Sequence, residues 1–493
     1  MHSATSGSAV SLSEVVEGSD HVAASSGGRL SETRAAVMVG AFAAAVRAIW
    51  VILASRAPVG LSDPYVYLQA AASLAGGRGY TSLLGRPTAY YPPGYPLFLA
   101  GVQKAAELVG QQSRLIVILG LAQAVLGGVG AAALVIAGCR LRPGIRLGIL
   151  AGMIFALWPN LIIHSGLVLS ESLFLCCFCV FLAALFTWTL SLQSQQPRHQ
   201  GAVLAVLLLA TAACTLVRPQ SMAVILPAAA VAWLMSGLGW RFALRCSGLL
   251  LVGMLIAILP WTLRNAVVMN EFVPMSTNTG DNFCIGFHQG ATGGFSISPE
   301  CATEGNYTDG PKVEVERDAE LRTRTMSWIV AHPGEIPELS YKKLRITLSH
   351  DADAVFAWES YGADAHLSSG QRSLLNWICN VYYWIVGMLG LAGVVLVLRA
   401  WWADRNSHER SAQASSALLL VTSCVFGVLL PVLFFGHERF KIPILPCVAL
   451  LAALAIHSLL RPGSRSSEAV STDSTSFADT DTEAGAEQEV TSD

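Results

Sequence analysis

One aspartate stands just beyond the first strongly apolar segment, where it could act as a general base. Asp63 follows the apolar run 35–55 by a few residues, within Ser62-Asp63-Pro64. A carboxylate at the boundary between membrane and water can accept a proton from a hydroxyl group that arrives from the aqueous side. Asp before Pro also begins many helices, so the simpler interpretation is that Asp63 caps a helix starting near Pro64. The two roles are compatible.

A second acidic residue opens a later apolar segment. Glu171 lies in Leu169-Ser170-Glu171-Ser172, and an ionisable group at such a membrane edge is a functional candidate by default. The alternative is a polar network with Ser170 or His164 that holds the start of the helix. Arg47 lies within the first apolar run, where a charge is costly unless it is paired, so we expect it to pair with an acid such as Glu171.

The composition of the chain indicates a membrane protein. Only 13% of its 493 residues are charged, against about 25% in soluble proteins, and its mean hydropathy is +0.53. A net charge of -2 provides no basic field for nucleic acid, which excludes nucleic acid as a partner. Cys176, Cys177 and Cys179 lie inside an apolar run, where we expect them to act as small hydrophobic residues and not as metal ligands.

Ten apolar segments are long enough, or nearly so, to cross a membrane as helices, which requires about 20 residues each. The segment 93–110 is interrupted by Lys104 and Glu107, and we expect it to lie at the membrane surface without crossing. The sequence therefore predicts an all-α polytopic membrane protein with about ten transmembrane helices. The ten segments are 35–55, 115–138, 147–163, 166–190, 201–217, 222–236, 246–262, 376–398, 413–435 and 442–460.

The distribution of basic residues predicts how these helices are oriented, because short cytoplasmic loops are enriched in Lys and Arg. If 93–110 does not cross, the basic turns fall on one side together with Arg29 and Arg34, and both termini are cytoplasmic. If 93–110 crossed the membrane, every helix after it would be inverted relative to the N-terminus. The basic turns would then indicate one side as cytoplasmic, and Arg29 and Arg34 would indicate the other. The basic turns contain Arg140, Arg142, Arg146, Arg198, Arg241, Arg245, Arg399, Arg405, Arg410, Arg461 and Arg465.

Four basic residues then fall on the opposite, external side, where such residues are usually rare. They are Arg218, Arg264, Arg439 and Lys441. Arg can hold phosphate oxygens through a bidentate contact, and Lys adds a point charge. Each of them could instead reach lipid headgroups, but four together favour a shared anion site. We therefore expect these side chains to form one anion-binding site at the external boundary.

The same topology divides the chain into a membrane domain and two terminal segments. The terminal segments are rich in small or polar residues and cannot bury enough surface to offset the entropy of ordering, so we expect both to be disordered and cytoplasmic. We expect the first apolar segment to be retained and not cleaved as a signal peptide. The predicted parts are 1–33, the membrane domain 34–462 with external loops 58–113 and 263–375, and the acidic, Ser/Thr-rich tail 463–493.

The second external loop is large enough to form a small cap. Stretches near 313–332 and 338–350 have helical character, so we expect a small, partly helical cap. Cys284 and Cys301 share this polar loop and could form a disulfide if it lies in an oxidising compartment.

Three motifs follow one another in the first external loop. They are Ser-Asp-x-x-x-Tyr from Ser62, Ala-x-x-Leu-Ala-x-Gly-x-Gly-Tyr ending at Tyr80, and Pro-Thr-Ala-Tyr-Tyr-Pro-Pro-Gly-Tyr-Pro from Pro87. This succession resembles the first external loop of GT-C glycosyltransferases, in particular the bacterial relatives of protein O-mannosyltransferases and of lipid A aminoarabinose transferases. In those enzymes an acidic residue of this loop is the proposed catalytic base, a role that the resemblance gives to Asp63. Many members carry a second acid directly after it, where this chain has Pro64.

Further positions are similar to family positions in the same order along the chain. The resemblance implies a GT-C-like bundle with interfacial helices in the first external loop, and it extends to Ser170-Glu171, Arg218, Arg264 and the run His437 to Lys441. It is compatible with a divalent metal ion, although no ligand cluster in the sequence requires one. The implied site residues are Asp63 and Glu171 for catalysis, Arg218, Arg264, Arg439 and Lys441 for the donor phosphate, and Tyr67, Tyr90, Tyr91, His437 and Glu438 for substrate binding.

The sequence and the resemblance together predict an integral-membrane glycosyltransferase of the bacterial inner membrane. It would move a sugar from a polyprenyl-phosphate donor to an external acceptor, which could be a lipid, a polysaccharide or a protein. The alternatives are a membrane ligase or phosphotransferase acting on lipid-linked sugars, or a transporter or flippase. A transporter would favour polar residues at mid-membrane depth and repeat symmetry, whereas the charges of this chain gather at the external boundary.

Overall fold

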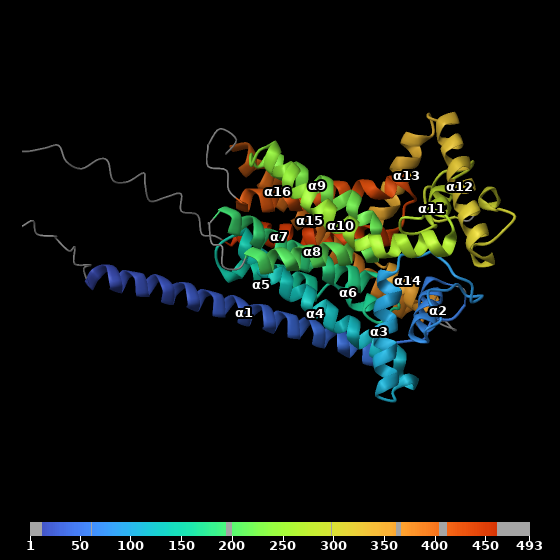
Figure 1. The fold of residues 1–493 in the computed structure, drawn as a ribbon. Coiled ribbons are helices and arrows are strands. Elements are labelled where there is room, and N and C mark those ends of the chain that lie inside the picture. The colour runs from blue at the N-terminus through green and yellow to red at the C-terminus, as the bar shows by residue number, and fades with distance from the viewer. Residues whose placement is uncertain are drawn as a thin grey trace, which may run out of the picture.

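Long apolar helices lying side by side make up most of this computed structural model, which describes residues 12–60, 62–193, 200–296, 298–360, 366–403 and 412–460 (Figure 1). Eight helices in this part of the chain are long and apolar enough to cross a membrane. The shorter apolar helices Ile145–Ala156 and Pro219–Met235 account for the other two predicted segments. The chain is therefore an all-α polytopic membrane protein, as predicted.

The helices follow one another with short 3₁₀ turns between several of them. Their bounds are α1 Leu12–Ala54, α2 Asp63–Ala75, α3 Gly94–Leu108, α4 Leu115–Leu141, α5 Ile145–Ala156, α6 Pro159–His164, α7 Glu171–Gln193, α8 Gln200–Val217, α9 Met222–Met235, α10 Trp240–Met269, α11 Thr279–Gly286, α12 Pro311–Ala331, α13 Ile336–Ser349, α14 Asp353–Ser360, α15 Ser369–Ala403, α16 Ala412–Leu429 and α17 Leu445–Leu459.

Small residues bring the backbones of the central helices close together. A Cβ atom on Gly128 of α4 would lie 2.7 Å from the carbonyl oxygen of Gly40 in α1. A Cβ atom on Gly138 would lie 2.5 Å from the Cα atom of Gly148 in α5. Such close approach is a common means of helix association where hydrophobicity alone does not drive helices together. The α4 helix is therefore the element around which α1 and α5 pack.

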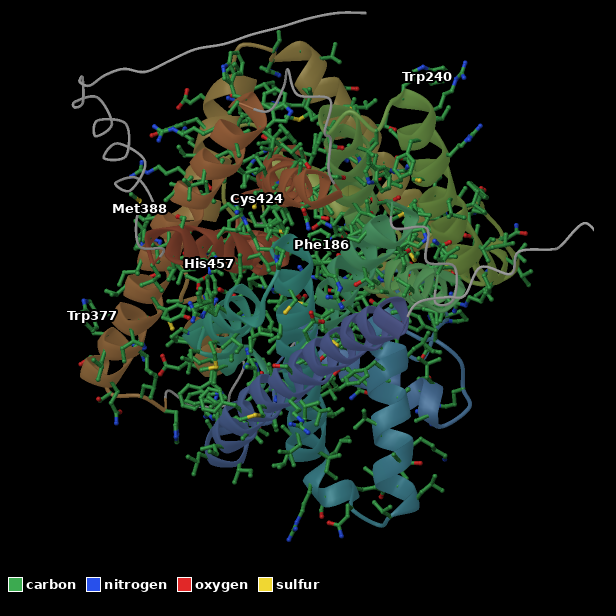
Figure 2. All side chains as sticks on the ribbon, turned by 90° about the vertical axis from the view of Figure 1, so that its left-hand side faces the viewer. Phe186, Trp240, Trp377, Met388, Cys424 and His457 are labelled. Atoms are coloured by element: carbon green, nitrogen blue, oxygen red, sulfur yellow. A yellow bond between two sulfur atoms is a disulfide. The ribbon has the colours of Figure 1, made fainter. Side chains whose placement is uncertain are left out.

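Large apolar residues lie both inside the bundle and on its outer surface. Figure 2 shows Phe186 within the bundle and Trp377 and Met388 on its outside. Phe186 is buried, whereas Trp240, Trp377 and Met388 are exposed. Exposed apolar residues of this kind over the long helices are expected where a protein contacts lipid.

The predicted segment 147–163 is broken in the structure, and Arg47 explains how the break is stabilised. Helix α5 ends at Ala156, and Pro159 begins the short helix α6. Arg47 donates hydrogen bonds to the carbonyl oxygens of Ala156 and Phe155, both at 3.0 Å. The expected pairing of Arg47 with an acid is therefore wrong: the unpaired carbonyls at a helix end compete for the guanidinium group.

Two further boundaries differ from the prediction. Helix α1 begins at Leu12, within the 1–33 segment that we expected to be disordered, and no proline interrupts this stretch. Helix α10 continues to Met269, beyond the predicted end at 262, so Arg264 lies inside it. Residues 1–11 and the predicted tail 463–493 lie outside the described residues.

The two long loops lie at the same end of the bundle. Helices α2 and α3 of the first loop and helices α11 to α14 of the second gather there (Figure 1). The second loop is partly helical, and Cys284 and Cys301 form a disulfide within it. This end is where the predicted site residues are found.

Candidate active site

Arg439 joins three segments that are far apart in the sequence. Its Nε atom donates to Oε1 of Glu171 at 2.8 Å, and its Nη1 atom lies 3.4 Å from Oδ2 of Asp63. Arg439 belongs to the 3₁₀ helix Glu438–Ile444, Glu171 to α7 and Asp63 to α2. The structure thus brings together two predicted catalytic acids and one predicted phosphate ligand.

Local sequence explains why both acids lie at the ends of helices. Asp63 is the first residue of α2, followed by Pro64, and Ser62 occupies the N-cap position. Glu171 is the first residue of α7. Carboxylates are stabilised in the first turn of a helix by the unpaired N–H groups and the helix dipole. Asp63 therefore lies next to the cap, and its carboxylate is available for Arg439.

A second arginine completes this charged cluster. The Nη2 atom of Arg218 lies 2.7 Å from Oε1 of Glu171, and the same side chain also donates to Ser170 Oγ at 3.2 Å. The side chain of Glu171 is 0% exposed, whereas that of Asp63 is 37% exposed. Glu171 therefore acts as a buried counter-ion that holds two guanidinium groups, and Asp63 is the carboxylate that a substrate can reach.

The predicted tyrosines surround Asp63. The hydroxyl group of Tyr91 donates to Oδ1 of Asp63 at 2.8 Å, and the ring of Tyr67 packs against that of Tyr91 with centroids 4.9 Å apart. Tyr90 donates to Asp281 at 2.9 Å and stacks on Tyr307 at 4.0 Å. Burial, reinforced by the Asp63 carboxylate, raises the pKa of Tyr91 well above its usual value. Tyr91 therefore stays protonated at neutral pH and remains a donor to Asp63.

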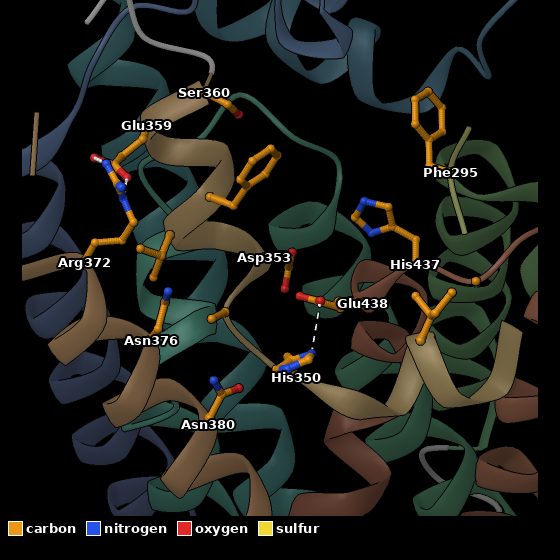
Figure 3. Close-up of a pocket in the computed structure, with 15 residues that line it drawn as sticks. Phe295, His350, Asp353, Glu359, Ser360, Arg372, Asn376, Asn380, His437 and Glu438 are labelled. Atoms are coloured by element: carbon orange, nitrogen blue, oxygen red, sulfur yellow. Dashed lines mark hydrogen bonds and ion pairs between the residues drawn. The ribbon is translucent and has the colours of Figure 1, made fainter. Parts of the chain in front are cut away.

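Two cavities lie next to this cluster. A smaller cavity of about 320 Å³ is lined by Asp63 and Tyr91 from the first loop and by Tyr307 from the second. A larger cavity of about 810 Å³ is lined by His437 and Glu438, the two residues that precede Arg439 (Figure 3). The smaller cavity gives a molecule access to the carboxylate of Asp63.

The other two predicted phosphate ligands, Arg264 and Lys441, contact other protein groups instead of Asp63 and Glu171. Arg264 donates to the carbonyl oxygens of Thr88 at 2.6 Å and Tyr80 at 2.9 Å, which ties the first external loop to α10. Lys441 is buried, lies 3.4 Å from Asp351 and donates to the carbonyl oxygen of His350. In this arrangement both cations hold loops in place.

A buried polar network behind the cluster was not predicted. The Nε2 atom of His164 lies 2.9 Å from Oδ2 of Asp353, Asn160 donates to Oδ1 of the same carboxylate at 2.8 Å, and Trp158 donates to Asp351 at 2.7 Å. Burial raises the pKa of Asp351 to about 7, although Lys441 opposes this shift. Burial also disfavours the charge on Asp353, but His164 and the hydrogen bonds outweigh it and hold its pKa well below the usual value.

One local signal could have indicated this network. The sequence Asp351-Ala352-Asp353 precedes the apolar stretch Ala354 to Trp358, so its acids stand at a helix start next to apolar residues. Its partners on α6 are more than 180 positions earlier in the chain, and only the fold brings them together. The network links the end of the second loop to the membrane helices.

The described residues contain no group of three or more His, Cys, Asp or Glu side chains that could hold a metal ion. Asp63 and Glu171 both face the guanidinium group of Arg439. In this arrangement both carboxylates are engaged by arginine and not by a metal-ligand cluster of the described residues.

Comparison with solved structures finds membrane proteins with related helical arrangements. The apo oligosaccharyltransferase of Archaeoglobus fulgidus matches with a TM-score of 0.49 and 14% identity over 86% of this chain and 50% of that one. The archaeal oligosaccharyltransferase AglB from Archaeoglobus fulgidus, in complex with an inhibitory peptide and a dolichol-phosphate, matches with a TM-score of 0.48 and 13% identity over 86% of this chain and 50% of that one. ArnT from Cupriavidus metallidurans bound to undecaprenyl phosphate gives 0.38 and 15% over 85% and 77%.

The chain spans about half the length of the oligosaccharyltransferases that it matches. No protein-family model and no curated protein sequence matches the chain.

Proposed function

We propose that the protein is an integral-membrane glycosyltransferase that moves a sugar from a polyprenyl-phosphate donor to an acceptor hydroxyl group on the external face of the bacterial inner membrane. One observation carries the proposal: the guanidinium group of Arg439 contacts both the reachable carboxylate of Asp63 and the buried carboxylate of Glu171. Sugar transfer needs a base for the acceptor and a cation for the departing phosphate, and this arrangement supplies both at one end of the bundle.

The proposed reaction uses the negative charge of Asp63 and the positive charge of Arg439. The Asp63 carboxylate accepts the proton of the acceptor hydroxyl as its oxygen attacks the anomeric carbon of the donor sugar. The bond from that carbon to the phosphate oxygen breaks, and the electron pair leaves with the polyprenyl phosphate. Arg439 and Arg218 stabilise the added negative charge on the phosphate through charge-assisted hydrogen bonds. Direct attack from the face opposite the phosphate inverts the anomeric configuration.

Glu171 has a positioning role in this mechanism. Its buried carboxylate contacts both guanidinium groups, at 2.8 Å to Arg439 and 2.7 Å to Arg218, so it holds them before any substrate arrives. Groups that are already placed need little reorganisation during the reaction, which is the main source of electrostatic catalysis. Tyr91 does the same for Asp63 through its hydrogen bond at 2.8 Å.

The proposal is tested by transfer assays with the purified protein in lipid and a set of radiolabelled polyprenyl-phosphate sugars. We expect Asp63→Asn to lower kcat by a factor of about 100 or more, since general-base catalysis contributes roughly 10²–10⁴-fold. We expect Arg439→Ala to lower transfer and also to weaken donor binding. Glu338→Gln is the matched control, because Glu338 is an exposed acid of the second loop that pairs only with Lys342 in the described structure.

Transfer that survives Asp63→Asn would remove the proposed base. Retention of anomeric configuration in the product would exclude direct displacement. Thermal unfolding of each variant, compared with that of the wild type, separates loss of chemistry from loss of fold.

A further inference from the structure

The larger cavity next to Arg439 has the size of a binding site. Its volume of about 810 Å³ lies within the range of roughly 300–1,000 Å³ that ligand pockets occupy. It lies between α14, the first turns of α15, the end of α13 and the segment 436–438. Figure 3 shows Asp353, Glu438 and His350 facing one another near its centre, with His437 on one side and Glu359, Arg372 and Asn376 on the other.

The charged side chains of this cavity are mostly acidic. Its lining contains the carboxylates of Asp353, Glu438 and Glu359 and a single guanidinium group, that of Arg372. Arg372 is paired with Glu359. Asp353 is paired with His164 of α6, and Glu438 lies 3.5 Å from the imidazole of His350, so the lining holds three carboxylates but only one arginine and no lysine. Burial, together with Arg439, lowers the pKa of His437, so this imidazole is neutral at pH 7 and does not offset the carboxylates. The cavity therefore carries an excess of negative charge.

The cavity also opens toward an apolar surface. Phe356 lines it and is 72% exposed. Phe295 also lines the cavity and is 57% exposed (Figure 3). Polar groups thus lie inside the cavity and apolar groups at its rim. A molecule with a hydroxyl-rich head and an apolar chain fits both parts.

We propose that this cavity binds the sugar of the lipid-linked donor and that it selects a sugar without an acidic group. This inference rests on the proposed function and goes beyond it by naming the class of sugar. Hydroxyl groups donate to carboxylates and to the amide oxygens of Asn376 and Asn380. A carboxylate or phosphate on the sugar would instead face the carboxylate of Glu438, while the single arginine of the lining is already paired with Glu359, and such a contact discriminates against the acidic sugar.

The position of the cavity favours the donor over the acceptor. His437 and Glu438 directly precede Arg439, the proposed partner of the donor phosphate, and both line this cavity. Asp63, the proposed base for the acceptor, lines the smaller cavity. A sugar in the larger cavity would therefore lie beside the phosphate to which it is attached.

The test uses pairs of polyprenyl-phosphate donors that differ only in the oxidation of the terminal carbon, such as a glucosyl and a glucuronosyl donor. Both Kd values and transfer rates are measured. We expect the wild type to favour the neutral member by roughly 100-fold, the effect of like charges at close range in a partly buried site. We expect Glu438→Gln to reduce this ratio by roughly tenfold. Glu338→Gln, which lies outside the cavity, should leave the ratio unchanged.

Equal use of the acidic donor, or an unchanged ratio in Glu438→Gln, would overturn the inference. A change in the acceptor KM without a change in the donor KM would assign the cavity to the acceptor and also overturn it. If no donor is transferred but the neutral lipid still binds preferentially and Glu438→Gln narrows that preference, the cavity inference stands and the proposed transfer reaction fails. If no donor binds, both fail.

Discussion

Exposure separates the roles of the two acids that contact Arg439. The carboxylate of Glu171 is fully buried between Arg439 and Arg218, and removing one member of a buried ion pair typically costs about 3–5 kcal/mol because the remaining charge is left uncompensated. Asp63 is partly exposed and lines a cavity, so its partner can be exchanged for a substrate. The same residue type therefore serves as a fixed counter-ion in one place and as a candidate base in the other.

Lys343 leads to a prediction about pH. Its side chain is buried, lies over the ring of Phe287 and donates to the carbonyl oxygen of Val432 at 3.2 Å. Burial lowers its pKa from 10.5 to about 7. Between pH 7 and about 10 the unfolded chain holds a proton that the folded chain lacks, so the contribution of Lys343 to stability rises with pH. We expect Lys343→Met to remove this rise.

The measurement is the thermal unfolding midpoint in detergent at pH 7 and pH 9. The gain from pH 7 to pH 9 should be larger in the wild type than in Lys343→Met by roughly 5 °C. Lys342→Met is the matched control, because Lys342 is partly exposed and pairs with Glu338. An identical pH dependence in the wild type and in Lys343→Met would show that the buried amine does not titrate in this range.

Residue types could be predicted from the sequence, but their partners could not. Asp63, Glu171 and Arg439 stand out because they are charged residues at the edges of apolar segments. Arg439 is 268 positions from Glu171 and 376 from Asp63, and no local pattern encodes those contacts. Arg264 is a residue for which the predicted partner differs from the observed one. Its residue type suits a phosphate, but in the fold it donates to two backbone carbonyl oxygens, those of Thr88 and Tyr80.

At the scale of elements, the segment that carries Arg439 is held by the second external loop. The backbone N–H of Gly436 donates to the carbonyl oxygen of Gly293 at 2.7 Å. A Cβ atom on Gly436 would lie 2.5 Å from the carbonyl oxygen of Lys343 and 3.0 Å from that of Gly293. We expect Gly436→Ala to displace this segment and to lower transfer by roughly 100-fold, since small misplacements of a positioning group have effects of this size.

Gly387→Ala is the matched control, because a Cβ atom at that position of α15 meets nothing within 4 Å. The assay is donor binding and transfer by each variant, with thermal unfolding alongside. Full activity in Gly436→Ala would mean that the second loop does not determine where Arg439 lies.

The helices were largely predictable because each apolar segment is long and continuous. The departures come from contacts between elements. The 147–163 segment breaks where Pro159 begins a new helix and Arg47 caps the end of α5 from another helix. Helix α10 extends past the predicted end because Asn265 is buried there and donates to the carbonyl oxygen of Val273 at 3.0 Å. Neither partner is visible in the local sequence.

At the scale of the whole molecule, the two ends of the bundle differ in chemistry. One end carries both long loops, the charged cluster and the Cys284–Cys301 disulfide (Figure 1). Disulfides persist in oxidising compartments, which supports the proposal that this end faces the outside of the cell. Basic residues at the other end, such as Arg140, Arg142 and Arg146, favour the cytoplasm for that end, in agreement with the same proposal.

This sidedness leads to the last prediction, which cysteine labelling can test. Glu338→Cys places a thiol on the second external loop, and Arg146→Cys places one at the start of α5, both at exposed positions. The free cysteines of the described residues are buried or half-buried, so they give a low background. In intact spheroplasts a membrane-impermeant maleimide should label Glu338→Cys, and it should label Arg146→Cys only after permeabilisation. The reverse pattern would place Asp63 and Arg439 on the cytoplasmic side, and a lipid-linked donor would then have to be used from that face.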